Sequence, residues 1–118
     1  MANKVKQMLR LAATIAQKTT SGKRRNFLLG AIGIRNDGVL VSASNIPAQR
    51  QTPEAHAEYR VSRKLDVGAV VFVARKNRVG RLCNAKPCFR CESAMRSKGV
   101  KRCFYTISNT KFGVMTLS

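Results

Sequence analysis

Two short segments of the chain carry side chains that bind metal ions. The first is His56-Ala57-Glu58, and the second, about thirty residues later, is Pro87-Cys88-Phe89-Arg90-Cys91. One histidine and two cysteines supply three protein ligands to a zinc ion and leave its fourth position for water, which the nearby Glu58 can reach. A metal that acidifies water beside a carboxylate that moves protons forms a hydrolytic site. A fold for this chain must therefore bring the two segments together.

Both segments are predicted to lie at the start of a helix. Thr52-Pro53 begins a helix that runs to about Leu65, with threonine as N-cap and proline at the first helical position. Pro87-Cys88 begins another, which ends at Gly99 after two basic residues. Helix N-termini favour anionic groups such as thiolates. If the two helix starts converge at one end of a sheet, the three ligands and Glu58 meet there.

The rest of the chain predicts one more helix and five strands. Apolar residues at helical spacing indicate an amphipathic helix over residues 5–16, and residues 75–86 are predicted to form a basic loop. The strands are expected at residues 27–34, 39–42, 69–74, 102–108 and 112–117. Asp37-Gly38 favours a hairpin turn, and the continuous apolar run at 69–74 is typical of a buried central strand. The order αββαβαββ indicates an α/β domain.

The last two predicted strands are separated only by Asn109-Thr110-Lys111. A parallel pair would need a crossover of about a dozen residues or more between its strands. These two strands must therefore form an antiparallel hairpin.

The charge balance of the chain is strongly basic. Lys and Arg together number 23 against 5 Asp and Glu, a formal net charge of +18. An excess of this size indicates polyanionic partners, with nucleic acid first and an anionic membrane second. A generally solvated cationic surface is the alternative, because a charge total does not locate a patch.

The length and the apolar pattern indicate one soluble domain. The 118 residues are enough to bury a modest core without disulfides. Lys4, Lys6 and Arg10 interrupt the stretch closest to an export signal, and no apolar run is long enough to span a bilayer. We therefore expect an intracellular, cytoplasmic protein whose four cysteines bind metal or are buried thiols.

The cysteines also leave a structural metal site open as an alternative. Cys83 lies five residues before Cys88 and could supply the fourth protein ligand of a structural zinc. In that case Glu58 would have no role, and the chain would be a nonenzymatic nucleic-acid-binding protein. Cys103 lies in a predicted apolar strand and is expected to be a core thiol.

Further residues around the two segments resemble the motifs of a known group of enzymes. Asn45-Ile46-Pro47 and the run from Pro53 to Glu58 are similar to motifs of tRNA adenosine deaminases, and Ala94-Met95 after the cysteines is similar too. The chain thus resembles the cytidine deaminase-like superfamily of zinc-dependent nucleobase deaminases. The resemblance implies a three-layer α/β fold, a five-stranded mixed sheet between helices, with residues 1–118 as a single zinc-dependent deaminase domain.

The resemblance also implies roles for the site residues. Zn²⁺ would be held by His56, Cys88 and Cys91, and Glu58 would be the catalytic proton carrier. The other residues that it implies in substrate binding are Asn45, Ala57, Pro87 and Phe89. Asn45 could instead shape a turn.

Two features depart from the closest motif relatives. The hairpin at the end of the chain resembles free-nucleoside cytidine deaminases and deaminase-type toxins rather than tRNA adenosine deaminases. The second departure is Lys86, directly before Pro87. Lys86 places a cation near the expected site entrance.

The expected reaction is hydrolytic conversion of cytosine to uracil. The basic balance favours a phosphate-bearing substrate, single-stranded nucleic acid or a nucleotide, over a bare nucleoside. Cations that could contact its phosphates are Arg75, Lys76, Arg78, Arg81 and Lys86. The alternative is an adenine deaminase acting on RNA or DNA, which the motif letters favour. No membrane partner is expected, and association into a homo-oligomer is left open.

Overall fold

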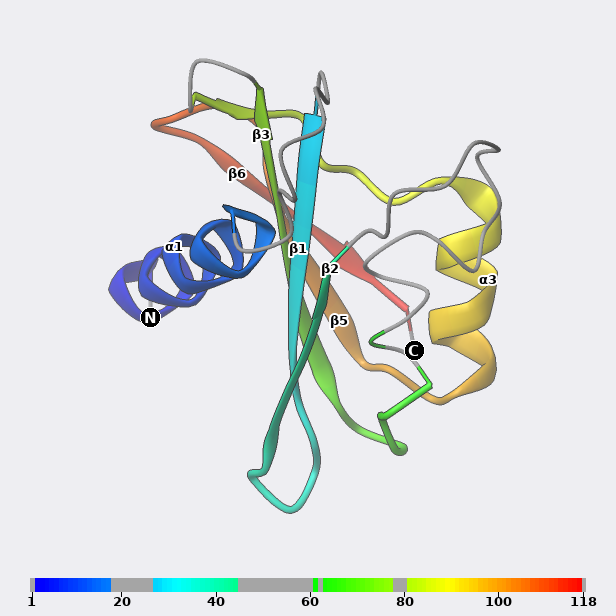
Figure 1. Ribbon diagram of the computed structural model, residues 1–118. Coiled ribbons are helices and arrows are strands. Elements are labelled where there is room, and N and C mark those ends of the chain that lie inside the picture. The colour runs from blue at the N-terminus through cyan, green and yellow to red at the C-terminus, as the bar shows by residue number, and fades with distance from the viewer. Residues whose placement is uncertain (1, 18–26, 45–60, 62, 78–80, 118) are drawn as a thin grey trace.

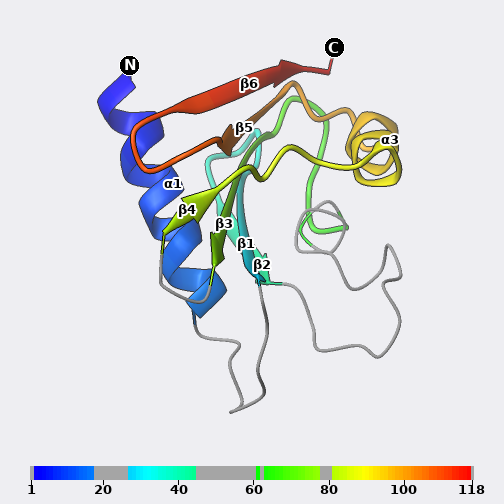
Figure 2. The same cartoon turned by 90° about the horizontal axis from the view of Figure 1, so that it is seen from above.

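A mixed β-sheet forms the middle layer of the protein, and a helix lies on each of its faces (Figures 1 and 2). The computed structural model describes residues 2–17, 27–44, 61, 63–77 and 81–117. The elements in these ranges are α1 (Ala2–Gln17), β1 (Phe27–Ile34), β2 (Leu40–Ser44), β3 (Val70–Asn77), β4 (Leu82–Cys83), α3 (Phe89–Ser97), β5 (Arg102–Thr106) and β6 (Phe112–Thr116). None of the helices in this part of the chain is long and apolar enough to cross a membrane.

The five predicted strands form one continuous row in the order β2-β1-β3-β5-β6. β3 and β5 are parallel, and the other neighbouring strands in the row are antiparallel. The predicted three-layer α/β fold and the antiparallel hairpin at the end of the chain are therefore confirmed.

β3 is the central strand, as its apolar run predicts. It pairs with β1 on one side and with β5 on the other, and Val71, Val73 and Ala74 are fully buried. Both faces of such a strand are buried, so apolar residues occupy successive positions instead of alternating with polar ones.

The turn between β1 and β2 confirms the hairpin predicted from Asp37-Gly38. The Arg35 amide donates to the Val39 carbonyl at 2.9 Å, and the Asp37 carboxylate accepts from the Val39 amide at 3.0 Å. Gly38 has φ +88°, a left-handed conformation that glycine adopts without steric cost. The short polar residue and the glycine thus fix the register of the two strands.

Residues 75–86 differ from the basic loop that the sequence predicts. β3 continues through Arg75, Lys76 and Asn77, and the short strand β4 then pairs with it, Leu82 opposite Lys76. The backbone of Lys76 also pairs with Leu28 of β1. Hydrogen bonds from strands on both sides keep these charged residues in the sheet, and local charge does not reveal such non-local pairing.

Each face of the sheet packs against its own group of apolar side chains. On one face, Ala12 and Ala13 of α1 pack with Ile32, as the amphipathic spacing of this helix predicts. On the other face, Met95 of α3 packs in a second cluster that also contains Leu65. Figure 2 shows the two helices on opposite sides of the strands. Leu65, seven residues after Glu58 in the sequence, therefore packs on the same face as α3.

Gly33 provides a test of the packing between β1 and the segment around Leu65. A Cβ added at Gly33 would overlap the Cδ2 methyl of Leu65, which is buried. We expect Gly33→Ala to lower the free energy of unfolding by about 1–3 kcal/mol, because overpacking forces neighbours to shift. Urea unfolding measures this change.

A double-mutant cycle separates this overlap from a general effect of the extra methyl group. In a Leu65→Ala background the clashing methyl is gone, so the cost of Gly33→Ala should shrink strongly. Equal costs in the two backgrounds would show that Gly33 is not needed for the packing of Leu65.

Candidate functional site

The two predicted cysteine ligands lie side by side at the start of α3. Cys88 is the N-cap residue, with an extended backbone, and its carbonyl accepts the first helical hydrogen bond from the Glu92 amide at 2.9 Å. Cys91 lies in the first turn and is fully buried, whereas Cys88 is exposed. Their sulfur atoms are 3.4 Å apart. The helix start therefore presents two thiols to one point, one of them open to solvent.

This pair of thiols fits two corners of a tetrahedral zinc site. Zinc–sulfur bonds of about 2.3 Å at a tetrahedral angle place two sulfurs about 3.8 Å apart. The sulfur separation of 3.4 Å is within a few tenths of an ångström of that value.

A buried threonine fixes the segment that leads to Cys88. Thr106, at the end of β5 and 1% exposed, donates through its hydroxyl to the Cys83 carbonyl at 2.7 Å. The same hydroxyl oxygen accepts from the Arg75 amide at 3.3 Å, and the Thr106 carbonyl accepts from the Ala85 amide at 2.9 Å. The segment before the cysteine helix is thereby held at the carboxyl ends of the parallel strands β3 and β5, where α/β sites lie.

The other end of α3 is held equally firmly. The Arg96 guanidinium donates to the Leu117 carbonyl at 2.9 Å and to the Glu92 carboxylate at 3.1 Å. Met95, near the end of α3, is fully buried against the sheet. Gly99 follows the helix with φ +79°, the terminating glycine that the sequence predicts. Anchored at both ends, the helix presents its first turn in a defined position.

The chain after the first metal segment is tied to the β1–β2 hairpin. Val61, three residues after Glu58 in the sequence, is fully buried in the same cluster as Met95. The Lys64 ammonium donates to the Ser42 carbonyl at 2.7 Å. Further along, the Asp66 carboxylate accepts from the Asn36 amide at 2.9 Å. These contacts hold Val61 in the cluster of Met95 and join the segment from Lys64 to Asp66 to the β1–β2 hairpin.

The remaining predicted site residues divide into buried, exposed and undescribed ones. Pro87 is buried and Phe89 is 80% exposed beside Cys88. Asn45, His56, Ala57, Glu58 and Arg78 lie outside the described residues. Their predicted roles therefore stay predictions.

The basic residues of the predicted phosphate track have unequal environments. Arg75 is partly buried in β3, and its guanidinium donates to the Asn84 carbonyl at 3.4 Å, which further steadies the segment before Cys88. Lys76 is also a partly buried strand residue. Arg81 and Lys86 are exposed. The exposed pair is thus better placed than Arg75 to meet a ligand from solution.

The other two cysteines are not equivalent to this pair. Cys103 is fully buried in β5, which confirms the predicted core thiol. Cys83 lies in β4, with its sulfur 3.5 Å from the Arg81 carbonyl. Among the residues that the structure describes, no three His, Cys, Asp or Glu side chains group as a metal site.

Comparison with known proteins decides the family. The model of the cytidine and deoxycytidylate deaminase zinc-binding region matches residues 2–107. The chain belongs to this family. Its cofactor is accordingly Zn²⁺, and the cytidine deaminase-like superfamily inferred from the motif letters is confirmed.

Solved structures support the same fold for this deaminase. Cytidine deaminase from Burkholderia pseudomallei superposes with a TM-score of 0.67 at 16% identity, over 94% of this chain and 91% of that one. The enzyme from Mycobacterium leprae gives 0.60 at 19% identity, over 94% and 91%. The enzyme from Bacillus anthracis gives 0.59 at 11% identity, over 97% and 84%. No curated protein matches the deaminase in sequence.

Sequence reasoning does not reveal Thr106 as a residue that holds the segment before Cys88 of this deaminase. Thr106→Val keeps the shape of the side chain but removes the hydroxyl bonded to the Cys83 carbonyl and the Arg75 amide. We expect a loss of about 1–3 kcal/mol in the free energy of unfolding, because buried polar groups lose their partners. Urea unfolding measures the loss, and Thr116→Val on an exposed strand position is the matched control. Equal effects of the two substitutions would contradict this role.

Proposed function

We propose that this deaminase converts cytosine to uracil in a phosphate-bearing substrate, either single-stranded nucleic acid or a nucleotide. The observation that carries the metal chemistry is the pair of adjacent thiols of Cys88 and Cys91 at the start of α3. His56 is proposed as the third zinc ligand and Glu58 as the proton carrier. Residues 1–118 then act as a single zinc-dependent deaminase domain.

The proposed roles account for every atom in the reaction. When bound, zinc lowers the pKa of a water molecule and so supplies a nucleophile at neutral pH. Glu58 carries one proton of the water to the ring nitrogen N3 and the second to the departing amine. The ring carbon C4 gains the water oxygen and loses ammonia, which leaves uracil.

The form of the sheet favours cytosine over adenine. β5 and β6 are antiparallel and joined by a short turn, an arrangement that resembles free-nucleoside cytidine deaminases. Solved proteins that are similar in fold include several named cytidine deaminases. Adenine remains the second candidate, because the letters from Asn45 to Glu58 are similar to tRNA adenosine deaminases.

The surface beside Cys88 supports a phosphate-bearing substrate. Phe89 is 80% exposed, and the exposed cations Lys86 and Arg90 flank it in the sequence. An exposed aromatic ring can stack on a base, and neighbouring cations can contact the phosphates on either side of it. Arg81 is a further exposed cation, seven residues before Cys88 in the sequence. These residues would extend the site beyond a bare nucleoside.

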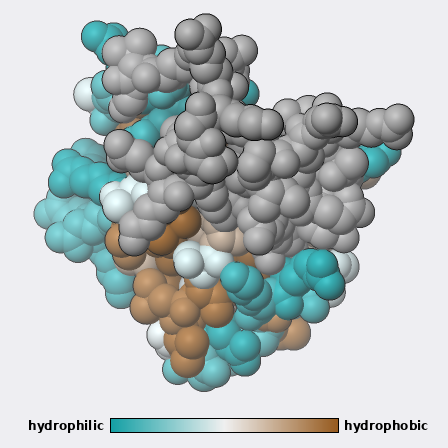
Figure 3. Space-filling model, in the orientation of Figure 1, coloured by the Kyte–Doolittle hydropathy of each residue, from teal (hydrophilic) through white to brown (hydrophobic). Residues whose placement is uncertain are grey.

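Self-association, which the sequence leaves open, is supported by an apolar surface. Figure 3 shows apolar side chains gathered at the lower end of one face, over the β1–β2 hairpin. Val39 and Leu40 there are 52% and 54% exposed. Exposed apolar groups of this kind favour contact with another protein surface.

Zinc retention tests the metal site directly. The purified chain should contain about one zinc ion, and Cys91→Ala should lose it, because three strong ligands are the minimum for tight binding at such a site. Cys103→Ala is the matched control, since Cys103 is another fully buried cysteine, and it should keep the metal. Metal analysis by mass spectrometry measures both. Loss of zinc on Cys83→Ala as well would favour the structural-zinc alternative.

Glu58 should be necessary for turnover and dispensable for metal binding. Glu58→Ala removes the proton carrier but no zinc ligand, so deamination should fall by at least about a hundredfold. Zinc content and unfolding free energy should stay close to those of the parent chain. Near-normal turnover by this variant on cytidine, deoxycytidine monophosphate, single-stranded DNA and RNA would show the assignment to be wrong.

Salt dependence tests the class of substrate. Binding of a polynucleotide releases counterions, so its apparent affinity should fall steeply with salt, whereas the KM for cytidine should barely change. Lys86→Glu with Arg90→Glu should weaken polynucleotide turnover. Lys98→Glu with Lys101→Glu, exposed cations beyond the other end of α3, is the charge-matched control. A salt-insensitive preference for free cytidine would overturn the phosphate-bearing substrate while leaving the deaminase in place.

A further inference from the structure

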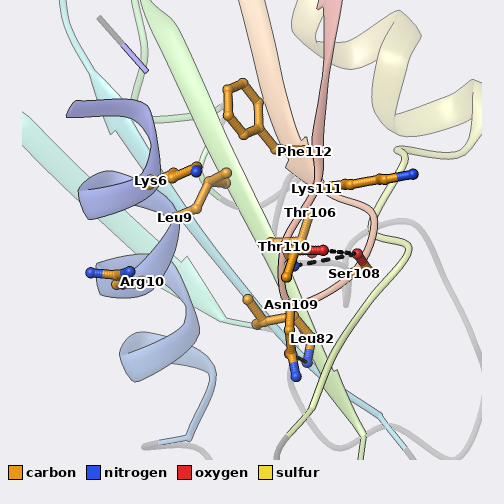
Figure 4. A pocket seen from close by; sticks show the side chains of 10 residues that line it. All are labelled: Lys6, Leu9, Arg10, Leu82, Thr106, Ser108, Asn109, Thr110, Lys111 and Phe112. Carbon is orange, nitrogen blue, oxygen red and sulfur yellow. Dashed lines mark hydrogen bonds between the residues drawn. The ribbon is translucent and has the colours of Figure 1, made fainter. Parts of the chain in front are cut away.

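A cavity of about 260 Å³ lies between α1 and the turn that joins β5 to β6. Figure 4 shows its lining, which comes from α1, from β4, from Thr106 and from residues 108–112. α1 covers the face of the sheet opposite α3, so this cavity and the cysteine pair lie on different faces (Figure 2). It is therefore separate from the candidate active site.

Three cations line the cavity. Lys6 and Arg10 are one helical turn apart on α1 and so share a helix face, and Lys111 belongs to the opposing turn. In Figure 4, Lys6 points toward the turn, whereas the head groups of Arg10 and Lys111 point outward on opposite sides. The described residues that line the cavity include no Asp or Glu, and no carboxylate in the described ranges forms an ion pair with these three cations. The rim is therefore positively charged and available to an anion.

The turn opposite α1 is held rigidly by its own hydrogen bonds. The Ile107 amide donates to the Lys111 carbonyl at 3.0 Å. The Asn109 side-chain oxygen accepts from the Leu82 amide at 2.7 Å, which ties the turn to β4. The Ser108 hydroxyl oxygen lies 3.4 Å from that of Thr110 (Figure 4). Two hydroxyl groups and a fixed amide side chain thus lie on the turn opposite Lys6, in a preformed site.

The remainder of the lining is apolar. Leu9 and Leu82 contribute aliphatic side chains, and Phe112 contributes an aromatic ring. That ring is supported from behind, because it packs edge-on against Phe104 with ring centroids 6.3 Å apart. A ligand that suits this lining has a flat apolar part as well as an anionic group. A long acyl chain fits less well, because hydroxyl, amide and cationic side chains interrupt the apolar surface.

We propose that this cavity binds the phosphate of a nucleotide and packs the flat base or sugar against its apolar side. Lys, Arg, Ser, Thr and Asn side chains are the usual partners of nucleotide phosphates, and an aromatic ring can stack on any base. The site takes either a free nucleotide or one unit of a single strand. It goes beyond the proposed deaminase reaction, because it lies on the other face of the sheet.

Thymidylate is a suitable probe, because it has no exocyclic amine and cannot be deaminated. Titration of the zinc-loaded chain with thymidine monophosphate, and separately with a short oligothymidylate, is followed by amide chemical shifts in NMR spectra. The amides of Ser108 to Phe112 and of Lys6 to Arg10 should shift. Shifts with the free nucleotide indicate a mononucleotide site, and shifts with the oligonucleotide alone indicate a strand-binding site.

Charge-reversed variants show whether the cavity itself makes the contact. Lys6→Glu and Lys111→Glu should each weaken thymidylate binding by about tenfold and lower its salt dependence. Lys4→Glu on α1 and Lys101→Glu before β5 are exposed, carry the same charge change and do not line the cavity, so they should change binding less than about twofold. Equal losses in both pairs, shifts confined to the surroundings of Cys88, or tighter binding to phosphatidylserine vesicles would overturn the proposal. Because no turnover is measured, this outcome is independent of the deaminase assays.

Discussion

The parallel pairing of β3 with β5 determines where the rest of the molecule can lie. Val70 pairs with Arg102 and Val73 with Tyr105, so the chain must cross from one end of the sheet to the other between these strands. That crossover contains β4, the segment held by Thr106, and α3. A parallel pair cannot be joined by a tight turn, and the connection places its helix on one face of the sheet. The start of α3, with its two thiols, is thereby set near the carboxyl ends of both strands.

Much of the fold could be predicted because local patterns and tertiary packing agree. The apolar run before Arg75 is the buried centre of β3, and Asp37-Gly38 is the turn that the hairpin requires. The short separation between the last two strands left only an antiparallel pairing, and the structure has it. In each case the local sequence alone restricts the structure, through its pattern of apolar residues, its turn residues or the length of the connection.

The parts that could not be predicted depend on contacts between distant segments. The residues around Lys76 do not indicate that its backbone pairs with strands on both sides. The sequence therefore predicts a loop for the end of β3 and for all of β4. Thr106 is an ordinary strand residue in sequence, and its role comes from the Cys83 carbonyl, more than twenty residues away. Of the candidate site, the cysteine pair lies as predicted, whereas His56 and Glu58 fall outside the described residues and stay predictions.

Thr106 is common to two regions that otherwise lie on opposite faces of the sheet. Its carbonyl holds Ala85 on the approach to Cys88, and its side chain both lines the cavity beside α1 and bonds to the Cys83 carbonyl. A ligand that displaced this one residue would therefore disturb the cysteine helix. If binding in the cavity changed the affinity of the metal site, metal binding would change the affinity of the cavity by the same factor, because coupling free energies are reciprocal. One buried side chain thus contacts both regions, so any shift of Thr106 would be felt on both sides of the sheet.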